Sequence, residues 1–234
     1  MLADPLLAQA AAATLETVSL RTSGGQDVSA SLARPSAAKA PMIMLIHEWW
    51  GLNDQIKAVD REFANEGYLA FAIDLYGGKV ASVPDDARSF MKQVDPEVAT
   101  DTVSSWVDWL RIHDRGNGNV ATIGWCFGGG WSLNTSLAVP VDATIVYYGN
   151  VAKTADQLKS LKGPVLGHFA AKDKWINQKM IDGFEAGMKG AGKTFETHWY
   201  EANHAFANPT QARYDEADAK LAWQRTLAFL KKHV

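Results

Sequence analysis

The chain has 234 residues, of which 47% are hydrophobic and 21% are charged, and its formal net charge is −3 at pH 7. This length and composition predict one large α/β domain, or at most two small ones, with a sizeable core, and they exclude intrinsic disorder. Because the chain carries no basic field, no nucleic-acid partner is expected. The only cysteine, Cys126, excludes an intramolecular disulfide, and a lone thiol suits a reducing compartment.

The first thirteen residues form an apolar segment, which we interpret as an N-terminal arm (residues 1–13) ahead of a single domain (residues 14–234). The segment has no Lys or Arg and carries Asp4 and Pro5, unlike a secretion signal, although it ends in small residues. We therefore expect a cytoplasmic protein, with a trimmed leader and a periplasmic location as the alternative. No apolar run approaches the ~20 residues that a membrane-spanning helix needs, so no membrane partner is expected.

Strands and helices alternate along the rest of the chain, without internal repeats. A hairpin around the turn Ser23-Gly24-Gly25 comes first, the later strands are short apolar runs, and the helices have apolar residues three and four apart. In order, the sequence predicts strands at 14–21, 28–34 and 42–46, a helix at 53–66, a strand at 69–75, a helix from 95, a turn at 116–119, a strand at 120–124, a helix just beyond 126, strands at 143–148 and 164–170, a helix at 176–188, a strand at 194–200 and a helix at 211–232. Such alternation predicts a mostly parallel central sheet with helices on both faces.

Cys126 lies in the motif Gly124-Trp125-Cys126-Phe127-Gly128, which is G-x-S-x-G with cysteine in place of serine. The motif is typical of a nucleophile elbow, a strained turn between a strand and a helix that exposes the nucleophile. The helix N-terminus then favours a thiolate. The alternative is a buried, inert cysteine, but the position between a predicted strand and a Gly-rich helix start favours the elbow.

Asp173 and His204 follow later strands in the order nucleophile, acid, base that this template requires. Asp173 follows the strand at 164–170, and His204 follows the strand at 194–200. Taken singly, Asp173 could cap the next helix and His204 could be a solvated loop residue. Because three placements agree with one template, the sequence predicts a Cys126-Asp173-His204 triad.

The sequence resembles the dienelactone hydrolase family of the α/β-hydrolases from about residue 40 to the C-terminus. The matching segments are Ile46-His47-Glu48-Trp49-Trp50-Gly51-Leu52-Asn53, Asp74-Leu75-Tyr76, Gly124-Trp125-Cys126-Phe127-Gly128-Gly129, Tyr147-Tyr148-Gly149, Asp173, and His198-Trp199-Tyr200 through His204-Ala205-Phe206. The resemblance implies a single α/β-hydrolase domain with the same triad. It also implies that Glu48 contacts the resting thiol and that the backbone N–H groups of Trp49 and Phe127 form the oxyanion hole.

The residues that hold the substrate depart from the family pattern. The family binds a substrate carboxylate with two arginines, one of which falls here on Asn208, while Arg88 is the only arginine in the segment expected to carry the other. We take Arg88 as a candidate ligand, with a solvated helix residue as the alternative. Trp50, Tyr76 and Phe206 are candidates for an aromatic wall. The loss of a guanidinium at Asn208 predicts a weaker preference for carboxylate-bearing dienelactones and useful activity on neutral aryl or short-chain esters.

The sequence thus predicts a cysteine-dependent hydrolase of lactones or short or aryl carboxylic esters, acting through an acyl-thioester. The alternatives are a thioesterase and a non-catalytic ligand-binding or thiol-sensing protein on the same scaffold. No metal or organic cofactor is implied, since His47-Glu48 lacks the second histidine of a zinc-binding H-E-x-x-H motif. The expected partner is a small-molecule ester or lactone, and the expected assembly is a monomer, with a homodimer as the alternative.

Overall fold

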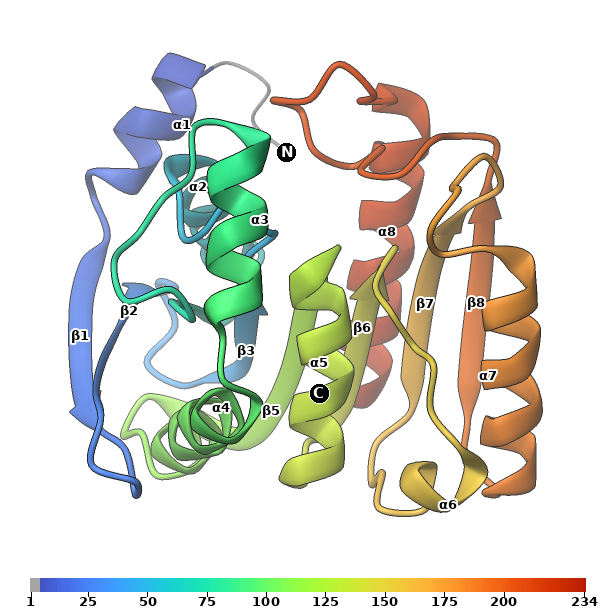
Figure 1. The fold of residues 1–234 in the computed structure, drawn as a ribbon. Coiled ribbons are helices and arrows are strands. Elements are labelled where there is room, and N and C mark those ends of the chain that lie inside the picture. Colours follow the sequence, from blue (N-terminus) through green and yellow to red (C-terminus); the bar gives the residue numbers. More distant parts are fainter. Residues whose placement is uncertain (1–4) are drawn as a thin grey trace. The chain divides into compact units, whose positions relative to one another are not determined.

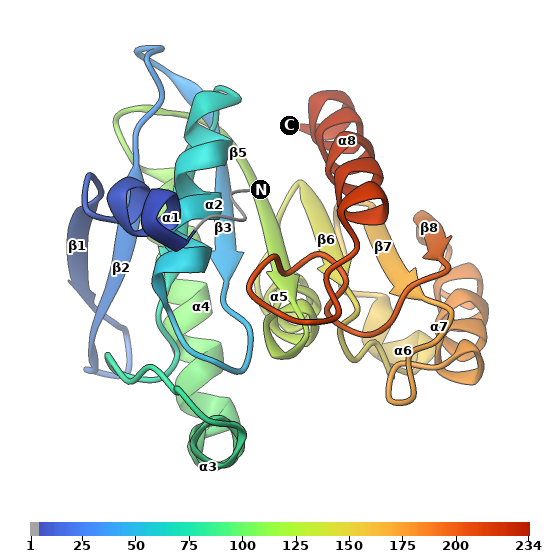
Figure 2. The same ribbon diagram turned by 90° about the horizontal axis from the view of Figure 1, so that it is seen from above.

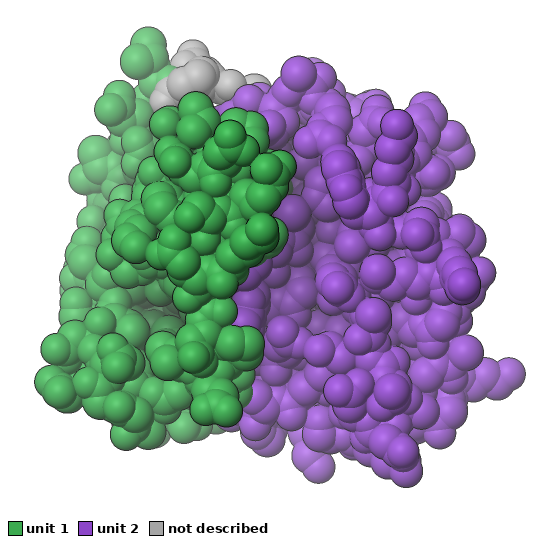
Figure 3. Space-filling model, in the orientation of Figure 1, with its two compact units in different colours: residues 1–120 green, residues 121–234 purple. Residues whose placement is uncertain are grey.

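The structure, a computed structural model, describes residues 5–234 and is of the mixed α/β class that the sequence predicts (Figure 1). Its contacts divide the chain into two compact units, Met1–Val120 and Ala121–Val234, which Figure 3 colours separately. Of the predicted arm, residues 1–4 lie outside the described residues, and a helix, α1 (Pro5–Ala12), covers most of the remainder.

The strands of the first unit begin with the predicted hairpin. Its two strands pair antiparallel, and the second pairs antiparallel with β4, which in turn pairs in parallel with β3. The observed bounds are β1 (Glu16–Arg21), β2 (Asp27–Ala33), β3 (Ala40–Ile46) and β4 (Leu69–Ile73). Every residue of β4 and nearly every residue of β3 is buried, as expected for strands covered on both faces.

Helices α2 and α4 cover opposite faces of these strands (Figure 2). Their caps follow from the sequence, because Asn53 and Asp95 accept hydrogen bonds from the first-turn N–H groups. The predicted apolar stripe of α4 is confirmed as buried: Ala99, Val103, Trp106, Val107 and Leu110. The helices after α1 are α2 (Asp54–Asn65), α3 (Pro84–Gln93) and α4 (Pro96–Arg111). The sequence did not predict α3, because this helix buries only Ala87 and has no side-chain cap.

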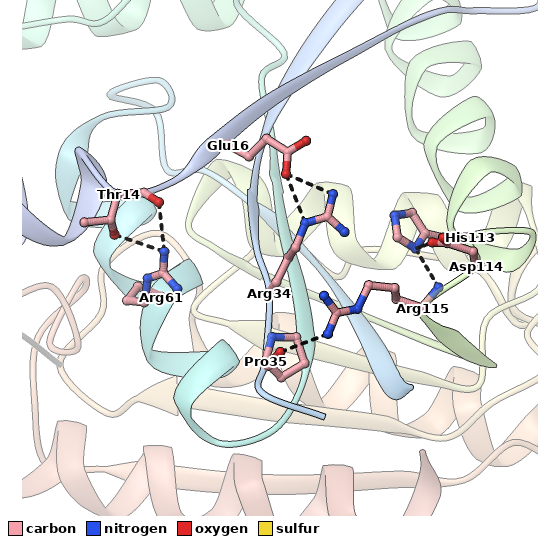
Figure 4. Close-up of polar contacts among 8 residues, drawn as sticks. All are labelled: Thr14, Glu16, Arg34, Pro35, Arg61, His113, Asp114 and Arg115. Carbon is pink, nitrogen blue, oxygen red and sulfur yellow. Dashed lines mark hydrogen bonds and ion pairs between the residues drawn. The ribbon is translucent and has the colours of Figure 1, made fainter. Parts of the chain in front are cut away.

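Polar contacts fasten the edges of the first unit (Figure 4). Arg61 on α2 donates to the carbonyl and hydroxyl oxygens of Thr14, just before β1. Arg115 donates to the carbonyl of Pro35, just after β2, and its own backbone N–H donates to the ring of His113. These bonds satisfy backbone groups where the strands leave the sheet.

The strands of the second unit run parallel in chain order, each beside the next. They are β5 (Gly116–Trp125), β6 (Ala143–Tyr147), β7 (Val165–Ala170) and β8 (Phe195–Tyr200). The first of them begins at Gly116, so the prediction of a turn at 116–119 is wrong as to extent. Turn chemistry is present there, since Asn117 Oδ1 accepts from Asn119 N and Gly118 has φ +97°, but extended backbone continues on both sides.

Figure 2 shows α8 on one face of β6, β7 and β8 and the remaining helices of this unit on the other. The helices are α5 (Phe127–Ala138), α6 (Ala155–Leu158), α7 (Gln178–Gly190) and α8 (Glu216–His233). Residues of α5, β6, β7 and α7 form one apolar core, which includes Leu133, Val146, Phe169 and Phe184. Two predicted starts are corrected by the caps: α7 begins after Asn177 and α8 after Asp215. None of the helices in residues 5–234 is both long and apolar enough to cross a bilayer.

Candidate active site

The backbone at Cys126 is strained in the way that a nucleophile elbow requires. Cys126 has φ +54° and ψ −114°, a conformation that residues other than glycine rarely adopt, between the end of β5 and the start of α5. Its N–H donates to the carbonyl of Tyr147 at 3.0 Å, and its carbonyl accepts from Gly129 N at 3.1 Å and from Gly130 N at 3.3 Å. The residue is partly buried and stands at the N-terminus of α5, where the helix dipole favours a thiolate.

Glycines around Cys126 allow this turn because the backbones pass too close for side chains. A Cβ at Gly124 would overlap the carbonyl of Gly128. A Cβ at Gly129 would lie 2.7 Å from Tyr147 O and 2.9 Å from the Cα of Gly149. Gly124 and Gly129 are therefore required by the close approach of strand, helix and the loop after β6.

Asp173 and His204 form a direct pair in the second unit. His204 Nδ1 lies 2.5 Å from Asp173 Oδ2, and the aspartate side chain is fully buried. The other carboxylate oxygen, Oδ1, accepts from Trp175 N at 2.8 Å and from Ile176 N at 3.1 Å. Asp173 is thus not the cap of α7, a role that Asn177 performs, and its carboxylate has both oxygens engaged.

Charge and hydrogen bonding fix the state of this pair. Burial acts to raise the pKa of Asp173, but the hydrogen bond and charge of His204, together with the two backbone N–H groups, lower the pKa below its ordinary value. An ionised carboxylate only accepts, so His204 must carry its proton on Nδ1 toward Asp173. The Nε2 atom is then left with a lone pair that can take a proton.

The parallel strands bring the candidate residues to one edge of the sheet. Cys126, Tyr148, Asp173 and His204 directly follow, or lie in the loops after, β5, β6, β7 and β8, which lie side by side. Tyr148 was not among the predicted site residues. Its ring is fully buried, packs 5.1 Å from the ring of His204, and extends from a backbone with φ +38°. The sequence predicted a strand through residue 148, but β6 ends at Tyr147, so the misplaced strand end concealed that Tyr148 directly follows a strand.

Trp175 forms an exposed rim beside His204. Its side chain is 61% exposed, and its ring meets the imidazole edge-to-face at 5.3 Å. The guanidinium of Arg213 lies over the indole at 5.8 Å. Phe206, by contrast, is fully buried between Tyr148 and Tyr200, so its ring supports the site from behind and is not part of an open wall.

Phe127, the other predicted oxyanion-hole residue, is the first residue of α5 in the second unit, whereas Glu48, Trp49, Trp50, Tyr76 and Arg88 lie in the first unit. Glu48 is 3% exposed and follows β3 directly, with Trp49 and Trp50 half-buried in the same loop and their rings 5.0 Å apart. Tyr76 is buried in the loop after β4. Arg88 lies on α3, where its exposed guanidinium pairs with Asp85 at 3.1 Å.

Asn208, which occupies the position of a family arginine, is committed to the backbone of its own loop. It is 2% exposed, and its Oδ1 accepts from the N–H and the hydroxyl of Thr210 at 3.0 and 2.8 Å. Among residues 5–234, no group of three or more His, Cys, Asp or Glu side chains is arranged to hold a metal ion.

Comparisons with known proteins agree with this geometry. The family model "Dienelactone hydrolase family" matches residues 28–234. A protein of Saccharolobus solfataricus assigned as a carboxymethylenebutenolidase is 30% identical, over 90% of this chain and 96% of its own length. The carboxymethylenebutenolidase of Pseudomonas putida is 27% identical, over 92% and 95%. A crystal structure from Klebsiella pneumoniae, of a protein assigned as a dienelactone hydrolase, superposes with a TM-score of 0.83 at 27% identity and covers 94% of this chain and all of its own.

The parallel strand order of the second unit, the strained turn at Cys126 and the Asp173–His204 pair are typical of an α/β-hydrolase. Within that class, the chain belongs to the dienelactone hydrolase family, as the resemblance predicted, and is a hydrolase of ester or lactone bonds.

Proposed function

We propose that this hydrolase works through a Cys126-Asp173-His204 triad and an acyl-thioester intermediate. The observation that carries the proposal is the 2.5 Å pair of Asp173 and His204 on the same strand edge as a strained cysteine at a helix N-terminus. A free thiol with a pKa of ~8.5 is mostly protonated at neutral pH, so it needs a base. His204 supplies that base through Nε2, and Asp173 holds the imidazole in the required tautomer.

The reaction then proceeds in two halves. The Cys126 thiolate attacks the ester carbonyl carbon, and the carbonyl oxygen becomes an oxyanion that accepts hydrogen bonds from the N–H groups of Trp49 and Phe127. His204 returns its proton to the departing alkoxide or enolate oxygen as the C–O bond breaks. Water, deprotonated by the same imidazole, hydrolyses the thioester and regenerates the thiol.

Glu48 is proposed to contact the resting thiol. A buried carboxylate beside a thiol discourages its ionisation and so keeps Cys126 protonated until substrate displaces the carboxylate. The burial of Glu48 at the end of β3 supports this role, because a simple surface glutamate would be exposed.

For the substrate, we propose neutral aryl or short-chain esters and lactones, with Trp50 and Tyr76 as apolar contacts. Asn208 carries an uncharged amide, so it offers no charge to a carboxylate, and its Oδ1 already accepts from Thr210 within its own loop. Arg88 remains the candidate for that contact, but its guanidinium already pairs with Asp85. The carboxylate-binding charge of the family is thus reduced in this chain.

The compartment and assembly proposed are the cytoplasm and a monomer. A partly exposed thiol serves as a nucleophile only while reduced, which a reducing compartment ensures. Light scattering of the purified protein checks the assembly.

The test uses the single cysteine. Because Cys126 is the only thiol in the chain, stoichiometric iodoacetamide modifies one known site. Turnover of p-nitrophenyl acetate is expected to fall to background after alkylation and in Cys126→Ala, whose circular dichroism and Tm should match the wild type. Undiminished turnover after complete alkylation would eliminate the thiol mechanism, and absence of any ester turnover in the wild type would favour the non-catalytic alternative.

A further inference from the structure

His47, at the end of β3, is fully buried and uses both ring nitrogens in hydrogen bonds to backbone. Its Nε2 lies 3.1 Å from Leu75 N, and its Nδ1 lies 2.6 Å from the carbonyl oxygen of Glu48. A backbone N–H can only donate, so Nε2 is the acceptor toward Leu75. The ring proton must then lie on Nδ1, which donates to Glu48 O.

The surroundings of the ring keep it neutral and in this tautomer. Burial lowers the pKa of His47, against the Glu48 carbonyl and the Asp74 carboxylate, which act to raise it. Asp74 approaches Nε2 at 3.8 Å, but its oxygens accept hydrogen bonds from Tyr76 N and Gly78 N. The ring of Tyr76 packs edge-to-face on the imidazole at 4.6 Å and prevents it from turning.

Glu48 is the first residue of a tight turn, and this turn is hydrogen-bonded to the loop after β4. Gly51 N donates to Glu48 O at 3.2 Å, and Ala81 N donates to Trp50 O at 2.9 Å. Gly51 has φ +90°, and a Cβ there would overlap the carbonyl of Lys79. These contacts hold the turn in one conformation. His47 supplies the side-chain hydrogen bond that orients the first peptide of the turn.

That first peptide joins Glu48 to Trp49, so its carbonyl and the Trp49 N–H belong to one rigid plane and point in opposite directions. Fixing Glu48 O consequently fixes the direction of the Trp49 N–H. Within residues 5–234, that N–H donates to no acceptor, which leaves its proton available to a substrate oxygen.

We propose that His47 is a positioning residue for acyl transfer: its Nδ1–H holds the Glu48–Trp49 peptide and so fixes the direction of the Trp49 N–H before substrate binds. This inference rests on the proposed function, in which the Trp49 N–H is one of two oxyanion donors. A donor held in place before reaction stabilises the transition state more than one that must reorient.

The test compares two variants of His47. One keeps the donor at the position of Nδ1, and the other keeps the acceptor at the position of Nε2. His47→Asn places an amide N–H near the position of Nδ1 and retains the bond to Glu48 O. His47→Gln places an amide oxygen near Nε2 and retains only the bond from Leu75 N. With p-nitrophenyl acetate, His47→Gln is expected to lower kcat about 10- to 100-fold with KM within about twofold, whereas His47→Asn stays within about threefold of the wild type.

A second readout separates positioning from general damage. Alkylation of Cys126 by iodoacetamide forms no oxyanion, so its rate in His47→Gln should equal that of the wild type although ester turnover falls. His113→Gln is the matched control, because the His113 ring also accepts from a backbone N–H in the same unit (Figure 4). This control is expected to keep wild-type kcat even if its Tm falls.

Three results would overturn the inference: wild-type kcat in His47→Gln, an equal loss of alkylation and ester turnover, or failure of His47→Asn to exceed His47→Gln. If neither variant folds, nitrogen NMR of the wild-type imidazole decides, since a proton on Nε2 contradicts the proposed bond. Failure of the proposed function is distinguishable, because it would appear in the wild type as turnover that survives alkylation of Cys126.

Discussion

At the scale of single residues, the site depends on side chains whose polar atoms are held in place by hydrogen bonds. The buried Asp173 carboxylate gives one oxygen to His204 and the other to two backbone N–H groups. The loop that follows β7 thus shapes itself around the carboxylate and then presents Trp175 at the surface. The Asp173 side chain therefore both orients the imidazole of His204 and fixes the conformation of the loop after β7.

Asp173→Asn is expected to leave the fold intact and to lower kcat by about 10²- to 10⁴-fold. The amide can still accept from the backbone N–H groups, but its NH₂ would face His204 Nδ1 and force the ring proton onto Nε2, where a base is needed. Steady-state hydrolysis of p-nitrophenyl acetate measures the loss. A decrease smaller than tenfold would mean that Asp173 does not orient the base.

Trp175→Ala is expected to reduce kcat/KM for phenyl acetate by about fivefold to tenfold, since an aromatic pair contributes about 1 kcal/mol. The indole lies beside His204, and in the proposed mechanism His204 protonates the leaving group, so an aryl leaving group is the group that the indole would contact. The loss for ethyl acetate should stay below about twofold, and Trp175→Phe should recover most of the activity. Equal losses for both esters would exclude an aryl contact.

At the scale of elements, the molecule relies on close approach where the backbone turns and on buried polar pairs where helices pack. The strand–turn–helix around Cys126 has no room for a Cβ at Gly124, whereas Gly183 in α7 has open space where a Cβ would lie. Helix α2 packs on β2 through the carboxyl group of Asp60, which accepts from the hydroxyl of Ser31 at 2.7 Å.

Gly124→Ala is expected to distort the elbow and lower both Tm and activity, the latter by more than about 100-fold, because the new methyl group overlaps the Gly128 carbonyl. Gly183→Ala in α7 is the matched control. No atom lies within 4 Å of its added Cβ, so it should gain about 0.5–1 kcal/mol from helix propensity and keep full activity. Thermal unfolding and p-nitrophenyl acetate turnover check both, and an active Gly124→Ala enzyme would contradict the steric account.

The contribution of Asp60 to stability should fall as the pH rises from about 4 to about 8, whereas the buried rings of His47 and His168, whose pKa burial lowers, act in the opposite direction. Burial raises the pKa of Asp60 to about 8, although the Ser31 hydroxyl acts to lower it. An unfolded aspartate has a pKa near ~3.9, so the stabilising difference is complete below that pH and is lost as the pH approaches 8.

Asp60→Asn should remove this slope, so its Tm at pH 8 is expected to exceed that of the wild type by several degrees, while at pH 4 the two are alike. Asp156→Asn, at an exposed side chain, is the control that should track the wild type. A Tm difference between Asp60→Asn and the wild type that is the same at pH 4 and at pH 8 would show that the pKa of Asp60 is not raised in the native state.

At the scale of the whole molecule, the sequence was sufficient to predict which residues meet where their position follows from the geometry of a parallel sheet. Parallel strands end at a common edge, so placing Asp173 and His204 after neighbouring parallel strands was enough to predict that the two side chains meet. Burial could not be predicted in the same way. Phe206 and Trp175 are both aromatic residues of post-strand loops, yet one is fully buried and the other is 61% exposed, because neighbouring loops decide the outcome.

The same limit applies to short or weakly patterned elements. Helices α3 and α6 bury one residue each, and such helices give little periodicity to read. Two further features depend on loop conformations that no local sequence pattern predicts. One is the hydrogen bond from Thr210 N to Asn208, and the other is the Trp49 N–H, which has no acceptor among residues 5–234.

The net charge of −3 and the missing arginine together predict the substrate preference of the intact enzyme. Preference for a dienelactone carboxylate over a neutral ester of similar size, as a ratio of kcat/KM values, is expected to stay below about a thousandfold and to change little with salt. Arg88→Ala should lower that ratio by less than about tenfold, because Asp85 already pairs with the guanidinium. A larger wild-type preference would mean that another cation binds the carboxylate.

The contact between Gly129 and Gly149 bears on how this enzyme can be re-engineered. Each glycine would place a Cβ within the backbone of the other, so a larger residue at one position cannot be accommodated by shrinking its neighbour, which is already the smallest possible. Libraries that randomise the start of α5 should therefore yield mostly inactive clones. Diversity is better spent on the loops that carry Trp175 and Arg213, where side chains are exposed and new specificities can arise without disturbing the elbow.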